Sequence, residues 1–485
     1  MSEEIRNLEP KQIWENFYQL TQIPRPSKKE ERIIAYMKKF GEDLGLETVV
    51  DGVGNVIIKK PATAGLENRK CIVLQGHIDM VPQANSDIDF NFETDPIDAY
   101  VDGDWVTAKG TTLGADNGMG VAATMGVLQS TDIAHGPIEA LFTIDEETGM
   151  TGAFGLKPGI LNADILMNLD SEDEGELYIG CAGGVDGNIE LTYTKEAAPA
   201  GTKAYKLWVK GLKGGHSGMD IILGIGNSNK ILFRILKNAA EFDVKLASVL
   251  GGSLRNAIPR ESHAVITVPE GKLAGFEKFL KEQETIISNE IKVVDPGLEV
   301  SLEETSAPSQ VFTKDSQCTL TNLIYGLPNG VMRMSNDMEG LTETSTNLAI
   351  IVSKADVVKI SCLLRSSVDS GKEDLKNMMD SVCKLAGATV KYEGEYPGWK
   401  PNPDSPILAT MLKGYENQFG IIPEIKAIHA GLECGLLGGV YPNWDMISFG
   451  PTIRSPHSPD EKVKIDTVQK FWDFLVETLK NVPAK

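Results

Sequence analysis

The sequence has few cysteines, no paired spacing among them, and no long hydrophobic run. Only six of its 485 residues are cysteine, and none lies in a Cys-x-x-Cys arrangement. A zinc ribbon or a disulfide framework needs such pairs, so we interpret the six as buried thiols in a reducing compartment. The apolar runs have the length of β-strands, whereas a membrane-spanning helix needs about 20 apolar residues. We therefore expect no membrane anchor.

The chain does not open with a basic segment, and acidic residues outnumber basic ones overall. The opening MSEEIRNLEPKQ lacks the basic segment and the apolar segment of a secretory signal, so we expect the mature chain to begin near Met1 and to stay in the cytoplasm. Lysine and arginine number 47 against 68 aspartates and glutamates, a formal net charge of −21. This charge repels nucleic-acid phosphates and anionic membranes, so we expect neither as a partner.

The hydrophobic pattern in the first part of the chain alternates between strand and helix. Buried-strand patterns at 71–75, 138–143 and 165–169 are separated by segments that include a helical pattern over 116–129. This alternation is typical of an α/β fold, and it predicts a mixed, mostly parallel sheet flanked by helices.

The pattern changes near residue 187 and again near residue 396. Strands and helices in the segment 187–395 alternate without acidic residues at the strand ends, which is typical of a separate α+β domain. The segment 396–485 opens with the proline-rich PGWKPNPDSP and carries His457, whose proposed partners lie before residue 171. We therefore predict one domain built from residues 1–186 and 396–485, interrupted by an inserted domain at 187–395.

Residue types that bind metals occur where strand-like segments end. His77 ends one such segment, Glu146-Glu147 and Asp170 follow two others, and Asp116 precedes the helical pattern. Ligands of parallel sheets gather at the carboxyl ends of the strands, so we expect these side chains to converge. A single carboxylate after a strand is most often solvated or caps a helix, and each of these, taken alone, could be one of those.

The charges of this group suit a pair of divalent ions. Two zinc ions carry four positive charges, against which five residues supply three negative ones if the histidines are neutral: His77, Asp116, Glu147, Asp170 and His457. A bridging hydroxide nearly completes neutrality and leaves each ion an open position, as a catalytic site requires. Such a pair lowers the pKa of bound water toward about 7 and polarises a carbonyl oxygen.

Two further carboxylates complete a mechanism of hydrolysis. Adjacent residues at a strand end point in different directions, so Glu146 can face the attacking water as general base while Glu147 binds metal. Asp79 lies two residues after His77 and can accept the second imidazole N–H, which fixes the tautomer.

Six segments resemble the motifs of a known family. In order, GHIDMVP, TLGADNG, DEETGMTGA, NLDSE, KGGHSG and RSPHSPDE are similar to those of the di-zinc exopeptidases, which include carnosinases, aminoacylases and glutamate carboxypeptidases. Together with AGLECG and the chain length, they are most similar to the bacterial branch that cleaves Xaa-His dipeptides such as β-alanyl-histidine. The resemblance covers nearly the whole chain and is weaker over residues 270–390.

The resemblance implies a ligand set. By it, His77 and Asp170 hold one zinc ion, Glu147 and His457 hold the other, and Asp116 bridges them. It also implies Glu146 as base, Asp79 as the residue that orients His77, and a cis peptide bond between Asp116 and Asn117. Cobalt or manganese can occupy similar ligand sets.

The resemblance also implies roles for the inserted domain, which would act as a lid and could join two copies into a homodimer. His216 would stabilise the carbonyl oxyanion. Asn256, Arg260 and Arg365 would bind the carboxylate end of the substrate, a task that suits a guanidinium. His429 and Glu433 in IHAGLECG are further candidates for substrate binding. Each of these could instead be an ordinary turn or strand residue.

The leading interpretation is a cytoplasmic metallopeptidase that hydrolyses Xaa-His dipeptides by attack of a metal-bridging hydroxide on the peptide carbonyl. A deacylase of N-acyl amino acids would use the same metal site. A non-catalytic metal-dependent binding protein would have no use for Glu146 beside Glu147. A glycosidase would use a pair of carboxylates but leaves His77, Asp79 and His457 unexplained.

Overall fold

The computed structural model describes residues 3–485 and divides into two compact units. The first unit contains the chain up to Gly180, Pro401–Ala427 and Leu432–Lys485, and the inserted unit contains Cys181–Lys400 and Ile428–Gly431. These limits differ from the predicted ones because strand β9 (Gly183–Thr192) and strand β21 (Thr389–Tyr396) both pair within the sheet of the inserted unit. That the two units act as catalytic and lid domains remains our proposal.

The first unit is built on an eight-stranded sheet in the order β1-β2-β6-β3-β7-β23-β8-β22. Its strands are β1 (Glu47–Val50), β2 (Val56–Lys60), β3 (Ile72–His77), β6 (Ile138–Thr143), β7 (Ile165–Asn168), β8 (Glu176–Cys181), β22 (Glu424–Ile428) and β23 (Asp445–Ser448). The four neighbours β6, β3, β7 and β23 run parallel, while β1, β2 and β8 pair antiparallel. The predicted mixed, mostly parallel sheet is confirmed in its centre.

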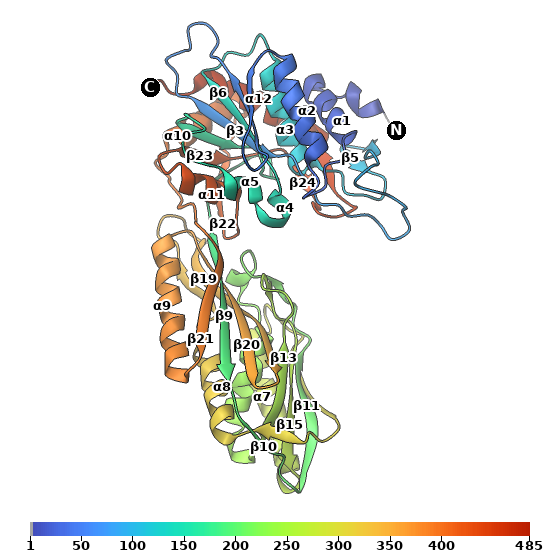
Figure 1. The fold of residues 1–485 in the computed structure, drawn as a ribbon, viewed down its shortest axis with the longest axis vertical. Coiled ribbons are helices and arrows are strands. Elements are labelled where there is room, and N and C mark those ends of the chain that lie inside the picture. Colours follow the sequence, from blue (N-terminus) through green and yellow to red (C-terminus); the bar gives the residue numbers. More distant parts are fainter. Residues whose placement is uncertain (1–2) are drawn as a thin grey trace. The chain divides into compact units, whose positions relative to one another are not determined.

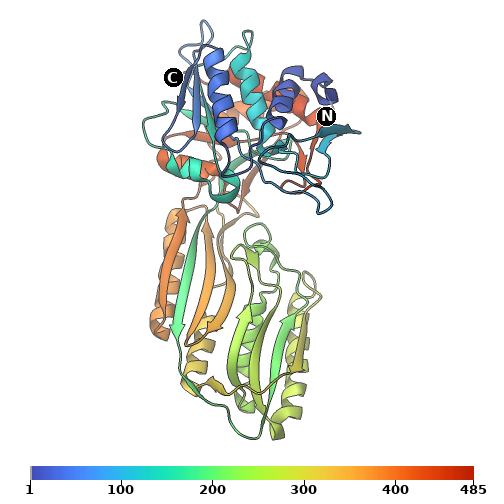
Figure 2. The same ribbon diagram turned by 45° about the vertical axis from the view of Figure 1, so that its right-hand side comes forward.

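Helices flank this sheet, and its central strands are buried on both faces. All residues of β3, β6 and β7 are buried, as expected for strands covered on both sides. The helices are α1 (Lys11–Thr21), α2 (Glu31–Asp43), α3 (Ala115–Gln129), α4 (Glu146–Gly149), α5 (Thr151–Gly155), α10 (Pro406–Phe419), α11 (Glu433–Val440) and α12 (Ile465–Asn481), with the 3-10 helix η1 (Glu3–Asn7). Helices α1, α2 and α3 lie side by side in both views (Figures 1 and 2).

A smaller four-stranded sheet joins the end of the chain to its beginning. Its order is β24-β25-β5-β4, with β4 (Ala99–Asp102), β5 (Trp105–Ala108), β24 (Ile453–Arg454) and β25 (Lys462–Lys464). Strand β25 pairs with β5 antiparallel, Val463 opposite Val106. The segment between β24 and β25, which carries His457, is therefore held against the N-terminal part of the unit.

The inserted unit is an antiparallel sheet with helices on one face (Figure 2). Its strand order is β16-β11-β15-β13-β19-β20-β9-β21, and β18 also pairs with β19. Besides β9 and β21, its strands are β11 (Thr202–Lys210), β13 (Lys245–Gly251), β15 (Ser262–Pro269), β16 (Glu299–Glu304), β18 (Gly330–Met334), β19 (Thr342–Lys354) and β20 (Val357–Ser366). The covering helices are α6 (Ser228–Asn238), α7 (Leu273–Ile291), α8 (Lys314–Gly326) and α9 (Asp369–Ala386).

Short elements complete the inserted unit. Strand β10 (Lys195–Ala197) pairs with β17 (Gln310–Phe312), and β12 (Gly215–His216) pairs with β14 (Ala257–Ile258). Three 3-10 helices, η2 (Ile221–Leu223), η3 (Ala240–Phe242) and η4 (Glu270–Lys272), lie in the connections. Across residues 3–485, no helix combines the length and apolar character needed to cross a membrane.

Candidate metal centre and catalytic site

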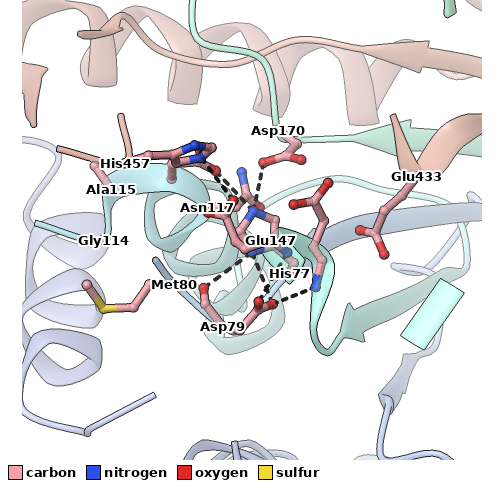
Figure 3. A network of polar contacts seen from close by, with 12 residues as sticks. His77, Asp79, Met80, Gly114, Ala115, Asn117, Glu147, Asp170, Glu433 and His457 are labelled. Atoms are coloured by element: carbon pink, nitrogen blue, oxygen red, sulfur yellow. Dashed lines mark hydrogen bonds and ion pairs between the residues drawn. The ribbon is translucent and has the colours of Figure 1, made fainter. Parts of the chain in front are cut away.

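Three of the five predicted metal ligands lie at or just after the ends of strands at one edge of the first unit's main sheet. His77 is the last residue of β3, Glu147 lies in the helical turn after β6, and Asp170 follows β7 by two residues. Because β6, β3 and β7 are parallel neighbours, their carboxyl ends meet at this edge. Asp116 comes from the start of α3 and His457 from the segment between β24 and β25. Figure 3 shows His77, Glu147, Asp170 and His457 gathered around one centre.

Asp116 is common to two groups of potential ligands. Its Oδ1 lies 3.0 Å from His77 Nε2, and its Oδ2 lies 3.2 Å from His457 Nε2. His77 Nε2 is also 3.4 Å from Asp170 Oδ1, and His457 Nε2 is 2.9 Å from Glu147 Oε2. In the group His77, Asp116 and Asp170, and again in the group Asp116, Glu147 and His457, one ligand atom of each residue lies within 4.8 Å of the others. All five predicted ligands therefore come together.

The residues fit divalent cations. Glu147 Oε1 is buried and accepts no hydrogen bond from the residues that the structure describes, whereas Asp170 Oδ1 contacts His77 Nε2 at 3.4 Å. A buried carboxylate oxygen without a partner is costly, and a cation at this position would remove that cost. Two imidazoles and three carboxylates form a nitrogen and oxygen donor set that suits zinc, cobalt or manganese.

Negative charge is concentrated at this site. Burial alone would lower the pKa of His77, but Asp170 and the other carboxylates outweigh it and raise that pKa well above its ordinary value. Hydrogen bonds to Asp116 and Glu147 raise the pKa of His457 to about 11. Burial raises the pKa of Glu146 well above its ordinary value. The side chains therefore favour any added positive charge, whether a proton or a metal ion.

Asp79 contacts both His77 and the backbone of the turn that carries Glu146 and Glu147. Its Oδ1 lies 3.4 Å from His77 Nδ1 and accepts the Glu146 backbone N–H at 3.1 Å, and its Oδ2 accepts the Glu147 N–H at 3.3 Å. The Ser27 hydroxyl donates to the same Oδ2 at 2.8 Å. One carboxylate thus contacts both the imidazole and the turn that carries Glu146 and Glu147. That Asp79 orients the imidazole stays a prediction.

Glu146 lies beside the ligands, and its neighbour in sequence is one of them. One oxygen of Glu146, one of Glu147 and a nitrogen of His77 lie within 4.8 Å of one another. Asp145 has a φ of 52°, in the left-handed region, which turns the chain sharply between β6 and α4. The peptide bond between Asp116 and Asn117 is cis, as the resemblance implied.

Glu433, the first residue of α11, is buried in the same unit. Its Oε2 accepts from Gln75 Nε2 at 2.6 Å and from the Thr143 hydroxyl at 2.8 Å, while its Oε1 has no partner among the described residues. Burial raises its pKa to about 8. Figure 3 shows the side chain beside the metal centre.

Sequence analysis missed two buried charges next to the ligands. Glu461 accepts four backbone N–H groups from residues 113–116, and Arg25 donates to the carbonyls of Ile78, Asp79 and Gly114. The only sequence signal was that Glu461 closes the RSPHSPDE segment, four residues after His457. Arg25 had none.

The predicted substrate residues of the inserted unit form a second group. His216 lies on β12 and Arg365 on β20, and the Arg365 guanidinium donates to the Tyr396 hydroxyl at 3.2 Å. Arg365 is buried and forms no salt bridge with any residue in 3–485. His429 Nε2 lies 2.7 Å from the Ser345 hydroxyl, and burial lowers the pKa of His429 to about 3, so this histidine is neutral.

The tautomer of His216 follows from its contacts. Its Nδ1 accepts the backbone N–H groups of Gly218 at 3.2 Å and Met219 at 3.1 Å, so the ring proton of the neutral form lies on Nε2. Burial lowers the pKa of His216, which favours this neutral form. The exposed residues Asn256 and Arg260 flank strand β14, which pairs with β12.

The fold and the metal centre define a class of enzyme. Residues 73–481 match the model of peptidase family M20/M25/M40, and the chain therefore belongs to this family. It is a metallopeptidase, and the predicted resemblance to the di-zinc exopeptidases is confirmed.

Individual relatives are similar over nearly the whole chain. The cytosol non-specific dipeptidase of Escherichia coli K12 is 46% identical over 483 residues, which are 99% of this chain and 100% of the relative. The crystal structure of aminoacylhistidine dipeptidase from Vibrio alginolyticus is 50% identical, covers 99% of both chains and superposes with a TM-score of 0.95. The aminopeptidase PepT of Bacillus cereus, at 17% identity and a TM-score of 0.62 over 98% of this chain and 99% of its own, shares the fold.

Proposed function

We propose that this protein is a cytoplasmic dipeptidase that hydrolyses Xaa-His dipeptides such as β-alanyl-histidine. The observation that carries the proposal is the pair of ligand groups that share Asp116, with the Glu146 carboxylate beside them. Two relatives at 46% and 50% identity are named as dipeptidases, which supports dipeptides as substrates, and the name of the second, an aminoacylhistidine dipeptidase, supports the Xaa-His choice. A homodimer through the inserted unit remains a prediction from the family resemblance.

Five residues are proposed to hold two divalent ions, with zinc as first choice and cobalt or manganese as alternatives. His77 and Asp170 would bind one ion, Glu147 and His457 the other, and Asp116 both. When bound, such a pair supplies an activated water and polarises the scissile carbonyl. The unpartnered Oε1 of Glu147 supports this assignment.

Proton transfer is assigned to Glu146. Its carboxylate lies among the ligands but is not needed as one, so it is free to take the proton of the attacking water and to deliver it to the leaving amine. Asp79 keeps the proton of His77 on Nδ1, so that Nε2 stays available toward Asp116 and Asp170.

Substrate binding is assigned to the inserted unit and to Glu433. The Nε2–H group of His216 is a donor for the carbonyl oxyanion. Arg365, buried without an acidic partner, is suited to the substrate carboxylate, with Asn256, Arg260 and the neutral His429 as further contacts. The free Oε1 of Glu433 would contact the amino end of the substrate.

The test is release of histidine from β-alanyl-histidine by metal-stripped protein before and after zinc is restored. We expect release only with zinc, and in Glu146→Gln a loss of about 100-fold or more with both ions still bound, because general acid–base catalysis contributes about 10²–10⁴-fold. An N-acetyl amino acid serves as the comparison substrate. Cleavage of that compound alone would make the protein a deacylase, and turnover of neither would favour a binding protein.

A further inference from the structure

The backbone of residues 113–116 is bound by a single side chain. The two carboxylate oxygens of Glu461 accept the N–H groups of four consecutive residues, at 2.8 Å from Leu113, 3.0 Å from Gly114, 2.7 Å from Ala115 and 3.2 Å from Asp116. Glu461 is 2% exposed and forms no salt bridge within the described part of the chain. Four amide donors fill the acceptor positions of one carboxylate, which explains how this charge is buried without a cation in contact.

Arg25 binds a carbonyl group of the same segment. Its Nη2 donates to the Gly114 carbonyl at 2.5 Å, and its Nη1 donates to the carbonyls of Ile78 at 3.1 Å and Asp79 at 2.8 Å. Gly114 has a φ of 72°, and a Cβ there would lie 2.6 Å from Arg25 Nη2. A Cβ on Gly118 would lie 2.8 Å from the same atom. These two glycines of TLGADNG leave room for the guanidinium.

These contacts connect three segments that carry proposed ligands. Arg25 joins the end of β3, where His77 lies, to residues 113–116, and Glu461 joins residues 113–116 to the segment of His457. The backbone of Glu461 is itself fixed, because its carbonyl accepts the Thr107 hydroxyl of β5 at 2.8 Å. Asp116, at the end of the bound segment, directs its two oxygens at two different histidines.

We propose that Glu461 is a positioning residue that holds Asp116 in the orientation in which its carboxylate can serve two metal ions. This inference rests on the proposed metal centre. Asp116 N–H and Ala115 N–H share Glu461 Oε1, so the carboxylate fixes the peptide planes directly before the Asp116 side chain. Without these bonds, Asp116 could turn away from one of the two histidines, and its carboxylate would no longer serve both ions.

Glu461→Gln tests the proposal, because it keeps the size of the side chain but turns an NH₂ group toward backbone donors. We expect both ions to bind about 10–100-fold more weakly, the range typical when a residue that orients a ligand is changed. The measurement is zinc and cobalt titration of metal-stripped protein against a chromophoric chelator. Hydrogen exchange of the metal-free protein should accelerate in the peptide that covers residues 113–116.

Asp295→Asn is the matched control. Asp295 is buried in the inserted unit and its carboxylate accepts the N–H groups of Lys213 at 3.0 Å and Gly226 at 3.2 Å, so its loss should destabilise the fold without changing metal affinity. Two ions bound by Glu461→Gln with wild-type affinity would overturn the proposal. Failure of the wild-type protein to bind two ions would instead overturn the proposed function.

A second variant covers the case in which Glu461→Gln does not fold. Glu461→Asp keeps the negative charge on a shorter side chain that cannot reach all four amides. Weakened binding of both ions, together with faster exchange of residues 113–116, supports the proposal. Unchanged affinity for both ions in this variant overturns it.

Discussion

At the scale of the residue, the site depends on carboxylates that bind different partners with each oxygen. Asp116 presents Oδ1 to His77 and Oδ2 to His457. Asp79 contacts the imidazole of His77 and the Glu146 N–H with Oδ1, and it accepts the Glu147 N–H with Oδ2. A carboxylate has about four acceptor positions, so one residue can fix several groups at once. Because each carboxylate fixes several groups, a small number of side chains is enough to define the centre.

Arg365 leads to a prediction about substrate binding. Replacing it with methionine should raise KM for β-alanyl-histidine by about 10–100-fold, because a hydrogen bond to a charged group contributes about 1.5–3 kcal/mol. The bound metal should not change, because every proposed ligand belongs to the first unit. Steady-state kinetics and metal analysis measure the two effects.

The control for this prediction is a substrate without the carboxylate. β-Alanyl-histamine lacks that group, so Arg365→Met should affect its KM little. If both substrates lose binding equally, the role of Arg365 is structural, through Tyr396.

At the scale of the element, glycines set how closely α3 approaches the strands that carry ligands. A Cβ on Gly76 of β3 would lie 2.2 Å from Asn117 Oδ1, and a Cβ on Gly120 of α3 would lie 2.3 Å from the carbonyl oxygen of Leu169. Both Asn117 and Leu169 adjoin a proposed ligand. Close packing of helix on strand thus brings Asp116 to His77 and Asp170.

Gly120→Ala should therefore destabilise the protein, although alanine is favoured over glycine in a helix by about 0.8–1.0 kcal/mol. The added Cβ meets a backbone carbonyl that cannot move alone, and overpacking of this kind costs about 1–3 kcal/mol. Gly414→Ala in α10 is the matched control, because its Cβ would meet nothing within 4 Å. Denaturant unfolding should show a lower free energy of unfolding for Gly120→Ala and a higher one for Gly414→Ala. A change in the same direction in both variants would contradict this explanation.

At the scale of the whole molecule, the chain contains two units with different roles in metal binding. All five proposed ligands lie in the first unit, although they come from positions as far apart as His77 and His457. A multidomain protein need not unfold in one transition, so a ligand can stabilise one part alone.

Zinc should therefore stabilise the first unit selectively. At 100 times the dissociation constant, one site adds about 2.7 kcal/mol to the free energy of unfolding. Hydrogen exchange with and without zinc should show added protection in peptides from the first unit, and little in those from Cys181–Lys400. Equal protection of both units would show that metal binding couples them. Asp116→Asn should abolish the effect.

The sequence by itself determined the central sheet, the helix over 116–129 and the five residues that converge as candidate ligands. Short apolar runs predict buried strands, and a charged residue directly after such a run is expected at the end of the strand. Because parallel strands end at one edge of a sheet, the hydrophobic pattern alone was enough to predict that His77, Glu147 and Asp170 lie close together.

Only the tertiary structure decided which further groups support that site. Glu461 contacts Leu113 across 348 positions of the chain, and Glu433 contacts Gln75 across 358. Arg25 binds backbone carbonyls, which every residue possesses and no sequence pattern marks. The limits of the inserted unit also depended on the pairing of β9 with β21. Local hydrophobic periodicity determines where helices and strands form. The partners of buried charged groups depend instead on how those helices and strands pack in space.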